Sequence, residues 1–380
     1  MAKVLLLDTA LAAAPLYDAL IAKGHDVWTV GNRPTDVLAR KAGSRWIDED
    51  YSQKKEIAAH ARCLKIDHTV PGCTDVSMET HVELALEPSL TDAVAVNRCL
   101  TNKAEFRILC SALNLAAPKT VRLEEFPMPG RFICKPVDGF SGHGITVFDG
   151  GDDKALKYAW ATAIEASPSA SALIETFVSG DLYSCSAFIE GHQIRHAFYV
   201  REGASCHPFA VDTSYLVRDF PPEAAAILEE NIRKISAALD LKAGLLHVQF
   251  ILDHQQPFIV EVARRCPGDL YPHLIEFSSG FPYGIEYVSH FLGVSSDARI
   301  TQRRFILRHT VAAVEGMIYG GFTLVDPLAV LAFFSLQVVG QELKGKQSTR
   351  AGVLFCEFES YYQLQSAYEG FLARQAYVLS

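Results

Sequence analysis

Lys135-Pro136-Val137-Asp138-Gly139-Phe140-Ser141-Gly142-His143-Gly144 says more about this 380-residue chain than any other segment. It holds three glycines within six residues, and a second lysine, Lys103, stands 32 positions before Lys135. Glycine lets the backbone approach a ligand and point N–H groups at an anion, and lysine adds a movable positive charge. Taken alone, the glycines also fit a tight hairpin turn, and Lys103 also fits a solvated helix residue.

Two oxygen-bearing side chains, Gln249 and Glu261, stand far downstream in apolar, strand-like stretches. We expect the two strands to pair as a hairpin. The two residues can then face each other only if the turn has an odd number of residues, three or five. A carboxylate among apolar neighbours is costly unless it is paired or binds a metal. For Glu261 the alternative is an ion pair with Arg264 or Arg265, and for Gln249 a hydrogen-bonded core amide.

Composition narrows the class of protein. The chain is 49% hydrophobic and 21% charged, which allows a sizeable core, and its net charge of −9 argues against a general electrostatic grip on nucleic acid or membrane. Nine cysteines without CxxC spacing are typical of free thiols in a reducing cytosol. No run approaches the ~20 apolar residues of a membrane span. We therefore expect a cytoplasmic protein with small-molecule partners, and leave a homodimer open.

The pattern of predicted elements divides the chain into three regions. Strands and helices alternate over residues 3–97, which predicts an open parallel sheet. No GxGxxG fingerprint follows the first strand, which argues against a nicotinamide enzyme. We predict domains at 1–97, at 98–300 with lobes of about 103–180 and 181–300, and at 301–380. The later elements are expected as helices over 102–113, 222–239 and 327–334 and strands over 131–135, 172–178, 183–189, 245–252, 257–262, 305–314 and 352–358.

Read in order, these segments resemble the ATP-grasp superfamily, most of all its carboxylate–amine ligases, the relatives of biotin carboxylase, carbamoyl-phosphate synthetase and D-alanine–D-alanine ligase. The resemblance covers residues 98–290. It implies an α/β and α+β protein: an N-terminal open parallel-sheet domain, a two-lobed ATP-grasp domain and a small C-terminal extension. It also implies ATP and Mg²⁺ as cofactors, with Mn²⁺ as a substitute.

The resemblance assigns the nucleotide-binding residues. Lys103 and Lys135 would hold the α- and β-phosphates, Lys135 with a catalytic role as well. The mobile loop over the γ-phosphate would be Ser141, Gly142, His143 and Gly144. Glu175 and Val178 would flank the adenine, with Phe177 packing nearby. Asp181 is the nearest acid for the ribose, although many family members carry that acid where this chain has Leu182 or Tyr183.

The same resemblance assigns the metal ligands. Glu261 matches the metal-bridging glutamate, and Gln249 stands where most members have a second glutamate. The Glu-x-Asn-x-Arg signature reads Glu261-Val262-Ala263-Arg264-Arg265, so Ala263 replaces the asparagine and Arg265 matches the catalytic arginine that steadies the transferred phosphoryl group. An amide oxygen can still serve Mg²⁺, a hard ion that prefers oxygen.

The implied activity is an ADP-forming ligase that joins a carboxylate to an amine through an acyl phosphate, on amino-acid-like or small natural-product substrates. Arg218 and Arg308 are candidates for a substrate carboxylate, and Asp269 would either face the amine or cap the following helix. Further pocket candidates are Arg201, His207 and His273. The alternatives are a carboxylase or carbamoylating enzyme of the same superfamily and a non-catalytic nucleotide sensor.

Overall fold

The computed structural model describes residues 1–139, 142–312, 316–344 and 349–380. The first domain is the expected parallel sheet, in the order β3-β2-β1-β4. Its strands are β1 (Lys3–Leu7), β2 (Asp26–Val30), β3 (Trp46–Ile47) and β4 (His68–Pro71). Helices α1 (Ala14–Ala22), α2 (Val37–Ala42) and α3 (Lys54–Leu64) connect them, and α4 (Asp75–Leu84) follows β4. Four of the five β1 residues are buried, because crossover helices cover both faces of a parallel sheet.

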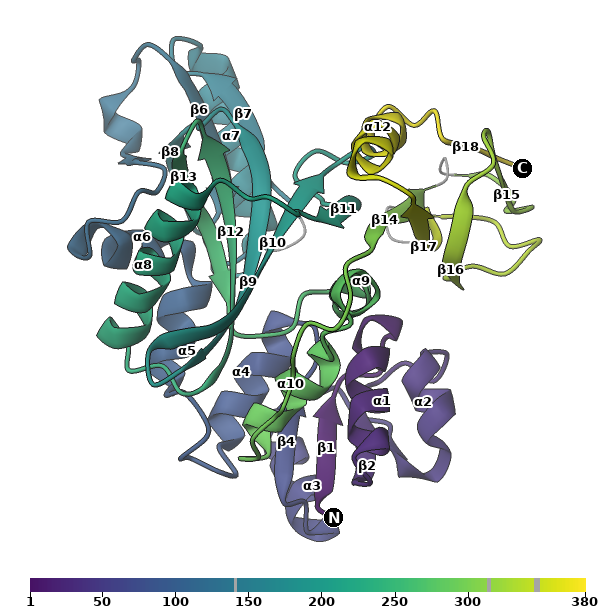
Figure 1. Cartoon of the computed structure of the whole chain (residues 1–380). Helices are drawn as coiled ribbons and strands as arrows, with labels where there is room; N and C mark the ends of the chain where they lie inside the picture. The colour runs from purple at the N-terminus through teal and green to yellow at the C-terminus, as the bar shows by residue number, and fades with distance from the viewer. Residues whose placement is uncertain (140–141, 313–315, 345–348) are drawn as a thin grey trace.

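A second, antiparallel sheet lies within the region 103–180 that the sequence analysis proposed as a nucleotide-binding lobe (Figure 1). Its order is β5-β8-β6-β7, with strands β5 (Thr120–Val121), β6 (Arg131–Pro136), β7 (Thr146–Asp149) and β8 (Ala172–Thr176). Helix α7 (Asp153–Ala166) covers it by burying Leu156, Ala159 and Ala163. Helices α5 (Val94–Thr101) and α6 (Lys103–Ala112) lead into this lobe from the first domain.

An eight-stranded antiparallel sheet organises the rest of the chain, in the order β13-β12-β9-β10-β11-β14-β17-β16. Its strands are β9 (Asp181–Glu190), β10 (Gln193–Gly203), β11 (Thr213–Leu216), β12 (Gly244–Asp253), β13 (Gln256–Ala263), β14 (Phe305–Ala312), β16 (Ala329–Ser335) and β17 (Arg350–Phe358). Strands β15 (Phe322–Leu324) and β18 (Tyr377–Leu379) pair separately. Because β14, β16 and β17 extend the large sheet, that sheet continues across the domain boundary predicted at residue 300.

Helices cover both faces of the large sheet. Helix α8 (Pro222–Ala238) buries Leu228 and Ile232 against one face, and α12 (Tyr361–Leu372) packs Tyr368 edge-to-face against Tyr215 of β11. The other face carries α9 (Tyr271–Ser279) and α10 (Tyr283–Phe291), and α10 packs against α1 of the first domain (Figure 1). The described helices include none long and apolar enough to cross a membrane.

The prediction of a helix over 327–334 is wrong. This segment forms strand β16, which pairs with β17 at the edge of the sheet. The apolar run Leu328–Phe334 has no period that separates a buried strand from a helix, so sheet pairing decides its conformation.

The hairpin of β12 and β13 corrects one expectation and confirms another. Its turn has two residues, His254 and Gln255, so the expected odd turn is wrong. Gln249 and Glu261 nevertheless face each other, as predicted. A β-bulge reconciles the two: Phe250 pairs with Ile259 and Gln249 with Glu261, which leaves Val260 unpaired.

Candidate active site

Lys103 stands where three segments meet. Asn102 caps α6 by accepting hydrogen bonds from the N–H groups of its first turn, so the helix begins at the lysine. The backbone N–H of Lys103 donates to the Val137 carbonyl at 3.0 Å. Its Nζ donates to the Gly139 carbonyl at 2.8 Å and lies 3.9 Å from Glu261 Oε2. The lysine therefore links the glycine loop to the strand that carries the predicted metal ligand.

Lys135 belongs to a fully buried charge bridge. Its Nζ lies 2.6 Å from Glu175 Oε2, and Arg107 Nε donates to Glu175 Oε1 at 2.6 Å. Glu175 has no exposed surface, and its carboxylate pairs with both cations. The resemblance had instead placed Glu175 beside the adenine. Arg107 Nη2 also donates to the carbonyl of the bulged Val260 at 2.8 Å.

The sequence analysis did not identify Arg107 as a site residue, although its spacing from Lys103 indicates it. It follows Lys103 by four positions on α6, and residues four apart share one face of a helix. Three cations, Lys103, Arg107 and Lys135, thus face two acids, Glu175 and Glu261. Burial lowers the pKa of Lys135, with Arg107 and Lys103 adding to the shift and Glu175 opposing it. This excess of positive charge is suited to an anion.

The glycine loop lies beside these cations. Ser141 falls outside the residues that the structure describes. Gly142 and Gly144 have φ of 70° and 73°, a region that favours glycine, and a Cβ at Gly144 would come within 2.4 Å of the Ala166 side chain. His143 is exposed between them. Glycine is therefore required at position 144 for the loop to lie against α7.

The connection between the two lobes runs from residue 177 to residue 180. The Phe177 N–H donates to the Arg131 carbonyl at 3.0 Å, and the Arg131 guanidinium lies 4.5 Å from the Phe177 ring. Phe177 and Val178 are both half-buried. Their part in adenine binding stays a prediction.

Gln249 and Glu261 place two oxygen-bearing side chains next to each other across the hairpin. The alternative ion pairs for Glu261 are wrong. Arg264 binds Asp92 at 2.7 Å, Arg265 binds Asp75 at 2.7 Å, and the ion-pair partner of Glu261 is Lys103. Gln249 Nε2 donates to Glu202 Oε2 at 2.9 Å.

The donor chemistry of this edge fits Mg²⁺. A carboxylate and an amide oxygen are the hard ligands that Mg²⁺ prefers, and it usually keeps water and substrate phosphates as its other ligands. No group of three or more His, Cys, Asp or Glu side chains gathers into a metal site within the described parts of the chain. Two protein ligands next to the predicted nucleotide site are consistent with this mode of binding.

Arg265 connects the end of β13 to the first domain. Its Nε donates to Asp75 Oδ1 at 2.7 Å and its Nη2 to Asp75 Oδ2 at 3.4 Å. Burial opposes its charge, but Asp75 and Glu261 outweigh that effect and raise the pKa of Arg265. Asp75 is the first residue of α4, 190 positions away. No local pattern could have revealed this pair.

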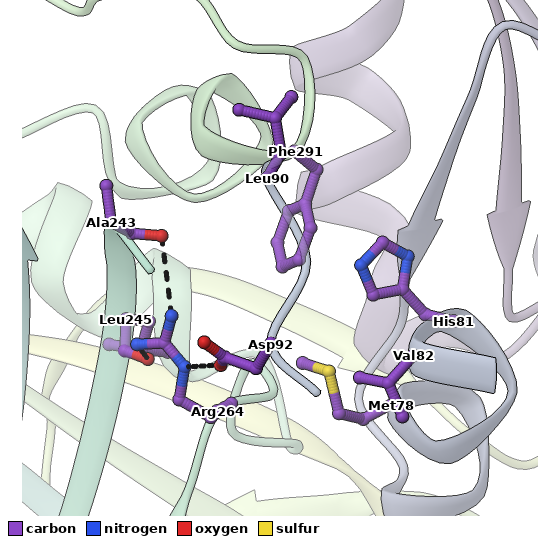
Figure 2. Close-up of a pocket in the computed structure, with 9 residues that line it drawn as sticks. All are labelled: Met78, His81, Val82, Leu90, Asp92, Ala243, Leu245, Arg264 and Phe291. Atoms are coloured by element: carbon purple, nitrogen blue, oxygen red, sulfur yellow. Dashed lines mark hydrogen bonds and ion pairs between the residues drawn. The ribbon is translucent and has the colours of Figure 1, made fainter. Parts of the chain in front are cut away.

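Arg264, the next residue back, has a structural role (Figure 2). It donates to Asp92 and to the carbonyls of Leu245 and Lys242. A cavity of about 10 Å³ beside it is lined by apolar side chains of α4 and α10 together with the polar His81 and Asp92, as Figure 2 shows. That volume holds about one water molecule, so it is no substrate site.

The substrate candidates separate into two groups. Buried Arg308 donates to the Asp269 carbonyl at 3.1 Å, and Arg350 pairs with the Asp269 carboxylate. Asp269 does not cap α9, because the N-cap position is Leu270. His273 instead binds Glu276 of its own helix at 2.9 Å, and Arg218 is half exposed. The structure brings Arg308 and Asp269 together and leaves the other two apart.

Asp181 lies on the opposite face of the sheet from Gln249. Alternation along β9 puts Asp181 and Tyr183 on one face and Leu182 and Ser184 on the other, where Ser184 is 3.1 Å from the Tyr271 hydroxyl of α9. Asp181 accepts a hydrogen bond from Arg201 at 2.6 Å. Both line a cavity of about 490 Å³ against α12. His207 lies in the β10–β11 connection and is half-buried.

Comparison with known proteins agrees with this geometry. Residues 128–272 match the family model of the ATP-grasp domain. The match covers less than half of the chain, and it confirms the resemblance to ATP-grasp proteins deduced from the motifs. No curated protein matches the sequence at a significant level.

Solved structures resemble the whole chain. L-amino acid ligase from Bacillus licheniformis is 14% identical, with a TM-score of 0.80 and coverage of 100% of this chain and 98% of that one. Phosphoribosylglycinamide synthetase from Anaerococcus prevotii is 15% identical, with a TM-score of 0.76 and coverage of 100% and 99%. Biotin carboxylase from Campylobacter jejuni is 13% identical, with a TM-score of 0.74 and coverage of 100% and 92%. At these identities the likeness concerns the fold, and it confirms the predicted architecture.

Proposed function

We propose that the protein is an ATP-dependent, ADP-forming ligase that joins a carboxylate to an amine. The observation that carries the proposal is the meeting of Lys103, the Lys135–Glu175–Arg107 bridge and the Gln249–Glu261 pair around the glycine loop. The structural likeness to L-amino acid ligase and phosphoribosylglycinamide synthetase supports it.

The reaction brings two anions together. A carboxylate oxygen of the substrate attacks the γ-phosphorus of ATP, the bond to the ADP oxygen breaks, and an acyl phosphate forms. Like charges in contact repel, so the enzyme must supply positive charge at this point. Lys103 and Lys135 would neutralise the phosphates, and Arg265 would steady the transferred group.

The amine completes the reaction. Its nitrogen attacks the acyl carbon, phosphate leaves, and the amine proton passes to a nearby acid or to the departing phosphate. Bound Mg²⁺ would screen the phosphate charge, and Glu261 and Gln249 would hold it. The chain positions and screens the reactants and needs no covalent protein nucleophile.

A phosphate-release screen with ATP, Mg²⁺ and all pairs of common amino acids tests the proposal. Release that requires two substrates supports ligation. Lys135→Ala and Glu261→Ala should abolish the release, whereas Lys157→Ala, at an exposed lysine of α7, should leave it unchanged. Release that requires bicarbonate would point to a carboxylase or carbamoylating enzyme. Nucleotide binding without release under any pair would point to a sensor.

A further inference from the structure

The side-chain amide of Gln249 is held in one orientation. It has a donor end and an acceptor end, and which way it points follows from its hydrogen-bond partners. Nε2 donates to Glu202 Oε2 at 2.9 Å. A carboxylate oxygen accepts hydrogen bonds, so Nε2 is the end that faces Glu202 and the amide oxygen Oε1 is turned away from it.

Glu202 is itself fixed in place. It lies on β10, two strands from Gln249, and the side chain between them on β9 is the small Ser184, which pairs with Gln249. Glu202 is 4% exposed. Its backbone carbonyl accepts a hydrogen bond from the Tyr368 hydroxyl of α12 at 2.9 Å. The backbone of Glu202 is therefore held by α12, and its buried carboxylate is the acceptor that orients Gln249.

We propose that Glu202 is a positioning residue that turns the Gln249 oxygen toward the metal edge shared with Glu261. This inference rests on the proposed function, because it assumes that Gln249 and Glu261 hold Mg²⁺ with a bound nucleotide. It explains why glutamine stands at position 249. A glutamate there would set two acceptors against each other, whereas the amide offers a donor to Glu202 and an oxygen to the metal.

Three variants separate this role from a general structural one. Glu202→Leu removes the acceptor. Gln249→Glu supplies the glutamate that most family members have but places it against Glu202. The double variant Gln249→Glu/Glu202→Gln restores a donor–acceptor pair with the roles exchanged. Glu357→Gln is the matched control, since Glu357 accepts hydrogen bonds from Arg304 away from the site.

The measured quantity is the free Mg²⁺ concentration at which binding of a nonhydrolysable ATP analogue is half-maximal. Isothermal titration calorimetry on the full chain measures this binding. Partners of metal ligands typically contribute 10- to 100-fold to metal affinity, so Glu202→Leu and Gln249→Glu should each raise this concentration about 10- to 100-fold. The double variant should recover most of the loss that Gln249→Glu causes, and the control should match the wild type. Melting temperatures show whether each variant is folded.

The inference is overturned if Gln249→Glu alone binds Mg²⁺ as tightly as the wild type, or if the double variant is no better than that single one. A different result would contradict the proposed function. If the wild-type protein binds the nucleotide no better with Mg²⁺ than without it, there is no metal site, and the inference about Glu202 is lost with it.

Discussion

Replacing Glu175 by glutamine should destabilise the protein strongly. The carboxylate is fully buried and lies 2.6 Å from both Arg107 Nε and Lys135 Nζ. A glutamine keeps one acceptor for the arginine but turns an N–H₂ group toward the lysine ammonium. Two buried cations then share no anion, and breaking a buried pair in this way costs about 3–5 kcal/mol.

The magnitude is large against the whole stability of a folded domain, about 5–15 kcal/mol. Glu357→Gln gives the comparison, because the Glu357–Arg304 pair has similar geometry but is about one-third exposed, with side-chain exposures of 36% and 31%. An exposed pair is worth about 0–1 kcal/mol. The structure thus predicts a difference of several kcal/mol between two substitutions of identical chemistry.

Urea unfolding, followed by circular dichroism at neutral pH, measures both variants. The double variant Arg107→Met/Glu175→Gln should lose less than the two single losses added together, because each single change leaves a charge unpaired. A loss below about 1 kcal/mol for Glu175→Gln, equal to that of the exposed control, would refute the reasoning.

Three further predictions concern other parts of the fold. Burial lowers the pKa of His247 to about 3, whereas its pKa in the unfolded chain is near 6.5. The unfolded chain therefore binds a proton that the folded protein does not, and the free energy of unfolding falls by about 2 kcal/mol between pH 7.5 and 5. His247→Gln should remove that share of the pH dependence in urea unfolding. Gly144→Ala should destabilise by about 1–3 kcal/mol because its Cβ meets α7, whereas Gly370→Ala, with open space inside α12, should stabilise by about 0.5–1 kcal/mol in the same assay. Asp75→Asn should lower kcat for phosphate release about tenfold with little change in nucleotide KM, because it loosens Arg265.

Each of these has an outcome that would contradict it. An unchanged pH slope in His247→Gln would show that the ring is not buried in its neutral form. Equal stabilities for the two glycine variants would remove the packing argument for the loop. A change confined to nucleotide KM in Asp75→Asn would show that the aspartate acts on nucleotide binding and not on Arg265.

The sequence was sufficient where function is encoded in local pattern. The lysine spacing and the glycine loop predicted the resemblance to ATP-grasp proteins, and alternation along two strands predicted that Gln249 and Glu261 face each other. The bulge at Val260 was beyond reach, because it is fixed by tertiary contacts such as the hydrogen bond from Arg107 to the Val260 carbonyl.

Contacts between residues far apart in the sequence could not be predicted either. Asp75 and Arg265 are 190 positions apart, and Glu202 and Gln249 meet only through the order of the strands. Strand β16 was mistaken for a helix because an apolar run gains its strand conformation from the neighbouring β17. Local chemistry was thus readable from the sequence, whereas the residues that hold it in position were visible only in the structure.

A crystal structure with a nonhydrolysable ATP analogue and Mg²⁺ tests the central claim most directly. We expect the triphosphate between the ammonium groups of Lys103 and Lys135 on one side and the Glu261 carboxylate on the other, with Mg²⁺ against Glu261. A triphosphate bound elsewhere, such as in the α12 cavity that Asp181 and Arg201 line, would contradict the account.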